Sequence, residues 1–175
     1  TVLSRGLGDV YKRQVTGGDA EGDTIDGFSG VIGTGYADTI TGDDAVNTLT
    51  GGAGADSLGG GSGDDMLDGG TESDTLDGGA GADSLLGGDG DDVLDGGAGA
   101  DTLSGGEGSD TLSGGLDGDV VAGGEGNDLV DGGDGDDTVS GDAGDDTISG
   151  GLGNDFMDGG EGADVLSGGD GDDSI

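Results

Sequence analysis

Fourteen aspartates recur every nine residues between residues 51 and 175, and they are the side chains of this sequence best suited to chemistry. Glu never takes their place, although Glu occurs elsewhere in the same segment. Because a purely electrostatic role would accept either acid, restriction to the shorter one indicates a fixed reach from the backbone to a ligand. A carboxylate is an oxygen donor for hard cations. The fourteen positions are Asp56, Asp65, Asp74, Asp83, Asp92, Asp101, Asp110, Asp119, Asp128, Asp137, Asp146, Asp155, Asp164 and Asp173.

The composition favours a cation as the partner and excludes several other classes of ligand. The chain of 175 residues has 41 acidic residues, 3 basic residues and a formal net charge of -38. Such a surface repels nucleic acid and anionic membranes. With no Cys and no His, disulfides and the usual zinc ligands are excluded as well. No apolar run approaches the ~20 residues of a transmembrane helix, and no N-terminal signal peptide is visible.

The first fourteen residues differ from the rest of the chain. They contain all three basic residues, Arg5, Lys12 and Arg13. Their last six letters, "DVYKRQ", are similar to the in-frame translation of a transposase-end sequencing adaptor. We interpret residues 1–14 as a non-native, adaptor-derived segment that takes no part in the fold, the alternative being a genuine linker.

From Gly51 onward the sequence is an uninterrupted series of nonapeptides, such as "GGDGDDVLD" from Gly87 to Asp95. Counted from the first Gly of each unit, the repeated aspartates occupy position six. One apolar residue in nine, at position eight, fits neither an amphipathic helix nor a long alternating strand. The position-eight residues are Leu58, Leu67, Leu76, Leu85, Leu94, Leu103, Leu112, Val121, Val130, Val139, Ile148, Met157, Leu166 and Ile175.

This spacing predicts an all-β solenoid in which each repeat forms a tight turn and then a very short strand. Stacked coils would bring the position-eight side chains into a column. Position seven is mostly Ser, Thr or Val, which suits a strand. Glycines at positions one, two and four permit the positive φ angles of a sharp turn with inward-pointing carbonyls. A flexible linker or a disordered polyanion would have no such strict register.

Other motifs fit the sequence less well. An EF-hand loop that starts at Asp89 would have Val93 at a position that needs an oxygen ligand. The glycine clusters lack the Lys of a phosphate-binding loop. Adjacent acids such as Asp91 and Asp92 recur in several repeats without a distinct constellation, so we expect no catalysis by this chain.

The nonapeptides follow the pattern G-G-x-G-x-D-x-U-x, where U is a large apolar residue. Over residues 51–175, and more weakly from about residue 18, the chain resembles the haemolysin-type (RTX) calcium-binding repeat family. The resemblance implies a parallel β-roll, a β-helix-like solenoid with two nonapeptides in each coil. It also implies Ca²⁺ ions, about a dozen, held between turns of alternate repeats by position-six carboxylates and glycine-turn carbonyls. These ions would neutralise most of the negative charge.

Three turns depart from the pattern. Glu72 and Asp117 replace Gly at position four, and Asp142 replaces Gly at position two. We expect these turns to be strained or to hold ions poorly.

Residues 15–50 are predicted to form degenerate N-terminal repeats that cap the roll of residues 51–175. The units "GTGYADTIT" (33–41) and "GDDAVNTLT" (42–50) keep the period of nine, but Asn47 stands where the acid is expected. Because the sequence stops within a repeat, we expect the roll to be truncated at its C-terminal end.

The resemblance implies a calcium-dependent folding module of a secreted bacterial protein that is exported by type I secretion machinery. The parent would carry a separate effector domain, as a toxin, protease, lipase, epimerase or adhesin. The expected location is extracellular or on the cell surface. The alternative hypothesis is an ion-stiffened structural spacer in a cell-surface or biofilm adhesin.

Overall fold

The computed structural model describes residues 29–175 and, upstream of them, the backbone of residues 23–24. The adaptor-derived interpretation of residues 1–14 therefore lies outside the described residues. The described chain folds into two β-sheets. Among its residues there is no helix with the length and apolar character that crossing a bilayer demands.

The strands alternate between the two sheets along the chain. The first sheet contains the nine odd-numbered strands: β1 (Asp23–Thr24), β3 (Thr39–Thr41), β5 (Ser57–Ser62), β7 (Thr75–Ala80), β9 (Val93–Ala98), β11 (Thr111–Leu116), β13 (Leu129–Asp134), β15 (Thr147–Leu152) and β17 (Val165–Asp170). The second contains the eight even-numbered strands: β2 (Val31–Ile32), β4 (Thr48–Ala53), β6 (Met66–Thr71), β8 (Ser84–Asp89), β10 (Thr102–Glu107), β12 (Val120–Glu125), β14 (Thr138–Ala143) and β16 (Phe156–Asp158).

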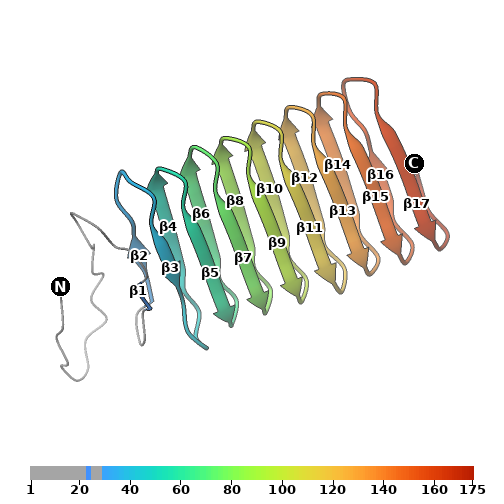
Figure 1. Cartoon of the computed structure of the whole chain (residues 1–175). Helices are drawn as coiled ribbons and strands as arrows, with labels where there is room; N and C mark the ends of the chain where they lie inside the picture. Colours follow the sequence, from blue (N-terminus) through green and yellow to red (C-terminus); the bar gives the residue numbers. More distant parts are fainter. Residues whose placement is uncertain (1–22, 25–28) are drawn as a thin grey trace.

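Neighbouring strands within each sheet are parallel and lie one coil apart. Val93 pairs with Thr111, and Thr102 pairs with Val120, so the register advances by two nonapeptides. The strands follow one another in chain order along the stack, as the colour sequence in Figure 1 shows. This arrangement confirms the predicted all-β parallel roll with two repeats in each coil.

The strands are longer than the sequence analysis predicts. Most span six residues, from position seven of one repeat to position three of the next. Gly52 pairs with Gly70, and Gly106 pairs with Gly124, so the parallel ladder continues through the glycine pair. The sequence obscures this continuation because glycine is depleted in strands generally.

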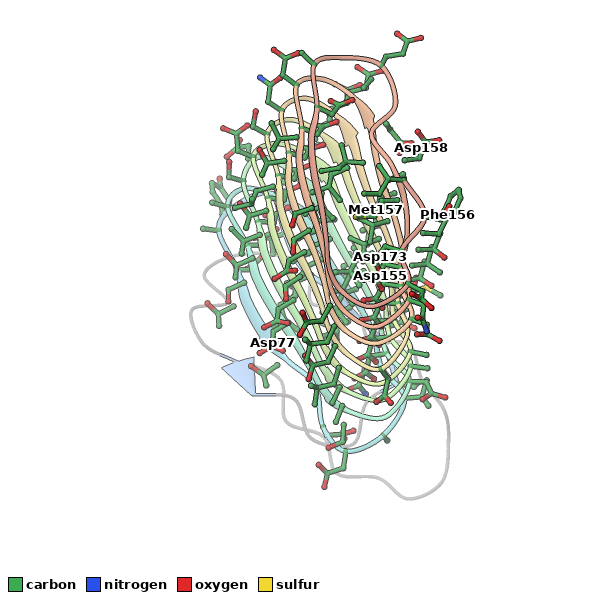
Figure 2. The ribbon with its side chains drawn as sticks, turned by 90° about the vertical axis from the view of Figure 1, so that its right-hand side faces the viewer. Asp77, Asp155, Phe156, Met157, Asp158 and Asp173 are labelled. Carbon is green, nitrogen blue, oxygen red and sulfur yellow. The ribbon has the colours of Figure 1, made fainter. Side chains whose placement is uncertain are left out.

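The core is the predicted column of position-eight side chains, contributed alternately by the two sheets. Figure 2 shows Met157 between the sheets, whereas its neighbours Phe156 and Asp158 point outward. Val31 belongs to the same column, which extends the period of nine upstream of the regular repeats. The buried members are Val31, Ile40, Leu49, Leu58, Leu67, Leu76, Leu85, Leu94, Leu103, Leu112, Val121, Val130, Val139, Ile148 and Met157, with Leu166 packed against them.

Candidate metal centre

The predicted ligand residues form two rows, one along each long edge of the stack, at the turns between the sheets. Twelve of the fourteen, from Asp56 to Asp155, are buried, with 1–3% of their surface exposed. Asp164 and Asp173, in the last coil, are half-buried. The first row is Asp56, Asp74, Asp92, Asp110, Asp128, Asp146 and Asp164; the second is Asp65, Asp83, Asp101, Asp119, Asp137, Asp155 and Asp173.

One carboxylate oxygen of each aspartate links neighbouring coils. The backbone N–H of Asp92 donates to Oδ1 of Asp110 at 2.7 Å, and that of Asp101 donates to Oδ1 of Asp119 at 2.8 Å. At the end of the stack Asp155 donates to Asp173 at 3.1 Å, and Figure 2 shows these two residues close together at the turn. The position-six side chains therefore hold successive coils in register.

The other carboxylate oxygen, Oδ2, is buried without a hydrogen-bond partner in all twelve aspartates from Asp56 to Asp155. A buried polar atom left unsatisfied costs about 1–3 kcal/mol, and more when it is charged. Twelve such atoms in two regular rows are a much larger burden than a folded chain normally carries. The arrangement calls for a positively charged partner at each turn.

A backbone carbonyl of the next coil faces the same place as the unsatisfied oxygen. A Cβ built on Gly96, at position one, would lie 2.5 Å from the carbonyl oxygen of Gly114 and 2.6 Å from Oδ2 of Asp101. Both distances are too short for a methyl group. A carboxylate and a carbonyl thus converge beside a glycine that leaves them uncovered, and this hard-oxygen donor set fits Ca²⁺.

The glycines of the turn have two different roles. Those at positions two and four have positive φ angles, such as 99° at Gly97 and 127° at Gly99, as the sequence predicts. The position-one glycines, such as Gly96, do not, which corrects that part of the prediction. Position one needs glycine because of the close approach of the two oxygens.

The three predicted departures are the three non-glycine residues with positive φ in the described chain. The φ angles are 76° at Glu72, 75° at Asp117 and 70° at Asp142. A left-handed conformation is unfavourable for residues with a side chain. The expectation of strained turns is confirmed at these positions.

Burial raises the pKa of the eleven position-six carboxyls from Asp56 to Asp146. Desolvation is the largest cause, a hydrogen bond from the preceding coil lowers the pKa in part, and neighbouring carboxylates raise it further. The pKa values rise to about 6 at Asp74, Asp101, Asp110 and Asp119. The direction is the same at Asp56, Asp65, Asp83, Asp92, Asp128, Asp137 and Asp146. A nearby cation would favour the ionised form.

Within the part of the chain that the structure describes, no three carboxylates gather around one point. A cation at these turns would therefore need backbone carbonyls beside the position-six carboxylates. Ca²⁺ takes six to eight oxygen ligands and accepts backbone carbonyls among them. The donor set fits Ca²⁺ better than a metal that prefers nitrogen or sulfur.

A second ladder runs outside the first, at position five. The N–H of a position-five residue donates to the position-five side chain of the preceding coil, as Ser109 does to Oδ1 of Asp91 at 2.9 Å. Seven short polar side chains at position five act as acceptors in this ladder. The acceptors are Asp64, Ser73, Asp91, Asn127, Asp136, Asp145 and Asn154.

Two position-six residues lie outside the predicted ligand set. Asp38 and Asn47 are buried in the same two rows, respectively two repeats and one repeat before Asp56. The period of nine, extended upstream from Gly51, places both residues at position six. Carbonyls of the glycine turns are expected as ligands, but those of position one carry no side-chain signal and could not have been singled out among them.

Comparison with known proteins agrees with the geometry. The chain matches the family model of the RTX calcium-binding nonapeptide repeat over residues 32–67, 68–103, 86–121, 104–139, 113–148 and 140–175. A search of curated proteins found no significant match. The matched segments together cover residues 32–175 and coincide with the coils of the roll. The chain belongs to the family of RTX calcium-binding nonapeptide repeats.

Proposed function

We propose that residues 51–175 are a calcium-dependent folding module of a secreted bacterial protein. The observation that carries the proposal is the two rows of buried Oδ2 atoms without partners, from Asp56 to Asp155. Without a cation the folded state must bury these charges unpaired, whereas with Ca²⁺ the binding free energy becomes folding free energy.

The proposed ligands are the position-six carboxylates together with carbonyl oxygens of the glycine turns. The residues act as ligands, and the module itself has no catalytic role. The carboxylates are those of Asp56, Asp65, Asp74, Asp83, Asp92, Asp101, Asp110, Asp119, Asp128, Asp137, Asp146, Asp155, Asp164 and Asp173.

An extracellular location follows from the concentration of calcium that such a module needs. Extracellular calcium modules bind with dissociation constants of about 10⁻⁴ to 10⁻³ M, well above cytosolic free calcium. The chain would stay unfolded inside the cell and fold after export by type I secretion machinery. The effector domain of the parent would be that of a toxin, protease, lipase, epimerase or adhesin.

A structural spacer in a cell-surface or biofilm adhesin is the second candidate. The observation that favours it is the constant register of the stack, which runs from β2 to β17 without an insertion in either sheet. Such a stack is a straight, extended body. The sequence downstream in the parent distinguishes the candidates, since a spacer would lead into further adhesion domains.

Circular dichroism during a Ca²⁺ titration tests the proposal. We expect a cooperative transition from coil to β-structure near millimolar Ca²⁺. Mg²⁺ should not replace Ca²⁺, because it demands a smaller, near-octahedral site and keeps its waters. Persistent disorder at several millimolar Ca²⁺, or an equal response to Mg²⁺, would contradict the proposal.

A further inference from the structure

In two turns at the N-terminal side of the stack, the position-six side chain accepts a hydrogen bond from within its own turn. In the turn of residues 33–38, Oδ2 of Asp38 accepts hydrogen bonds from the backbone N–H of Thr34 at 2.6 Å and from its hydroxyl at 2.9 Å. In the turn of residues 42–47, Oδ1 of Asn47 accepts the N–H of Asp43 at 2.8 Å. Both donors are the position-two residue of the same turn.

The regular turns have no such bond. Oδ2 of Asp56 is buried without a partner. It lies beside Gly51, the position-one glycine of its own turn, just as Oδ2 of Asp38 lies beside Gly33. Asp38 instead lacks a partner at Oδ1, the oxygen that accepts from the preceding coil in later repeats. The residue eighteen positions before Asp38 lies outside the described residues.

The strands also end earlier at these two turns than in most of the stack. In most regular coils position two belongs to a strand, as Gly52 of β4 does, and pairs with the same position of the next coil. β2 and β3 end at Ile32 and Thr41, before position one of the following turn. The N–H groups of Thr34 and Asp43 are outside the strands, and each donates to the side chain four residues ahead in the same turn.

We infer that the turns of residues 33–38 and 42–47 close by hydrogen bonds, bind no Ca²⁺, and end the calcium array on this side. This inference rests on the proposed calcium function and runs against the family match, which includes both turns. Ca²⁺ at Asp38 would have to displace two hydrogen bonds. At Asn47 the side chain is a neutral amide, whose Nδ2 faces Oδ1 of Asp43 at 3.5 Å.

A matched pair of Asp to Asn variants tests the inference in the full chain. Asn keeps an oxygen that can accept the N–H of Thr34, but it removes the charge that a calcium ligand needs. Native mass spectrometry at saturating Ca²⁺ should give the same number of ions for the wild type and Asp38→Asn. Asp92→Asn, in a regular turn, should lose at least one ion. Loss of an ion from Asp38→Asn would overturn the inference.

Amide hydrogen exchange gives a second readout that does not depend on counting ions. The N–H of Thr34 should exchange slowly in the folded chain, and Asp38→Ala should speed its exchange about tenfold, as the loss of one hydrogen bond predicts, without changing the ion count. Rapid exchange of Thr34 in the wild type overturns the inference. If the wild type binds no Ca²⁺, the proposed function fails, and the exchange of Thr34 alone decides this inference.

Discussion

At the scale of single residues, the backbone angles identify which repeats are imperfect. Glu72, Asp117 and Asp142 have φ angles near 70–76°, where the neighbouring repeats have glycine. Each such residue costs on the order of 1–3 kcal/mol relative to an unstrained conformation. The cost is tolerated because the stacked coils on both sides hold the turn in place.

Replacing these residues by glycine should stabilise the calcium-loaded roll. We expect Glu72→Gly, Asp117→Gly and Asp142→Gly each to raise the free energy of unfolding by about 1 kcal/mol, because glycine adopts a positive φ without strain. Urea denaturation at fixed Ca²⁺ measures the change. Glu107→Gly is the control, since it also removes an acid but lies in β10 without a positive φ. An equal gain in the control would show that charge, not strain, is responsible.

At the scale of the turn and strand, glycine is needed at position one because there is no room for a side chain, and not because the backbone has a positive φ angle. In Gly96→Ala the new methyl group would meet the Gly114 carbonyl and the Asp101 carboxylate, the two oxygens proposed to face the cation. Overpacking of this kind costs about 1–3 kcal/mol. We expect this variant to need more Ca²⁺ to fold, with the midpoint read from circular dichroism.

Gly59→Ala is the matched control for the same chemical change. Gly59 is at position nine of β5, has no positive φ, and its added Cβ would have Thr41 Cγ2 as its nearest neighbour at 3.9 Å. The calcium midpoint should stay close to that of the wild type. Equal effects of the two variants would contradict the role assigned to position one.

The core column makes a second prediction at the scale of the strand. Leu94 is 1% exposed, whereas the adjacent Val93 is 47% exposed on the outer face of β9. Leu94→Ala should lower the free energy of unfolding by about 2–5 kcal/mol. Val93→Ala should change it much less, because little apolar surface is lost. Urea denaturation of the calcium-loaded chain would compare them, and similar losses would contradict the assigned core.

At the scale of the whole molecule, the net charge of -38 opposes folding in the absence of cations. Burial raises the pKa of Asp74, Asp101, Asp110 and Asp119 to about 6, from the ordinary value of 3.8. Between about pH 4 and pH 6 the folded chain therefore binds protons that the unfolded chain has released. Its ion-free stability is greatest below this range and is lost as the pH rises through it.

Acidification should thus partly replace calcium. In calcium-free buffer we expect the β-structure signal in circular dichroism to increase as the pH falls from 7 to 4. The unfolded chain gains nothing comparable, because its carboxyls titrate near their ordinary pKa. A signal that is unchanged or lower at pH 4 would contradict the assignment of buried, unpaired carboxylates.

Much of the fold and part of the candidate site could be predicted from the amino-acid sequence. The period of nine assigned Leu94 to the core and Asp92 to the turn, because every repeat meets the same surroundings in a stack of identical coils. The three imperfect turns were also visible, since Glu72, Asp117 and Asp142 each replace a glycine. These features depend only on the period of nine and on the type of residue at each position of the repeat.

Only the tertiary structure decided how each oxygen is used. It distinguishes Oδ1, which accepts an N–H from the preceding coil, from Oδ2, which has no partner at Asp92 and accepts from Thr34 at Asp38. It also assigned the position-one glycines to close approach instead of to positive φ. The physical reason is distance along the chain. The N–H groups that bond Oδ1, and the residues that the N–H groups of a turn bond in return, lie eighteen residues away, in the coils stacked on either side.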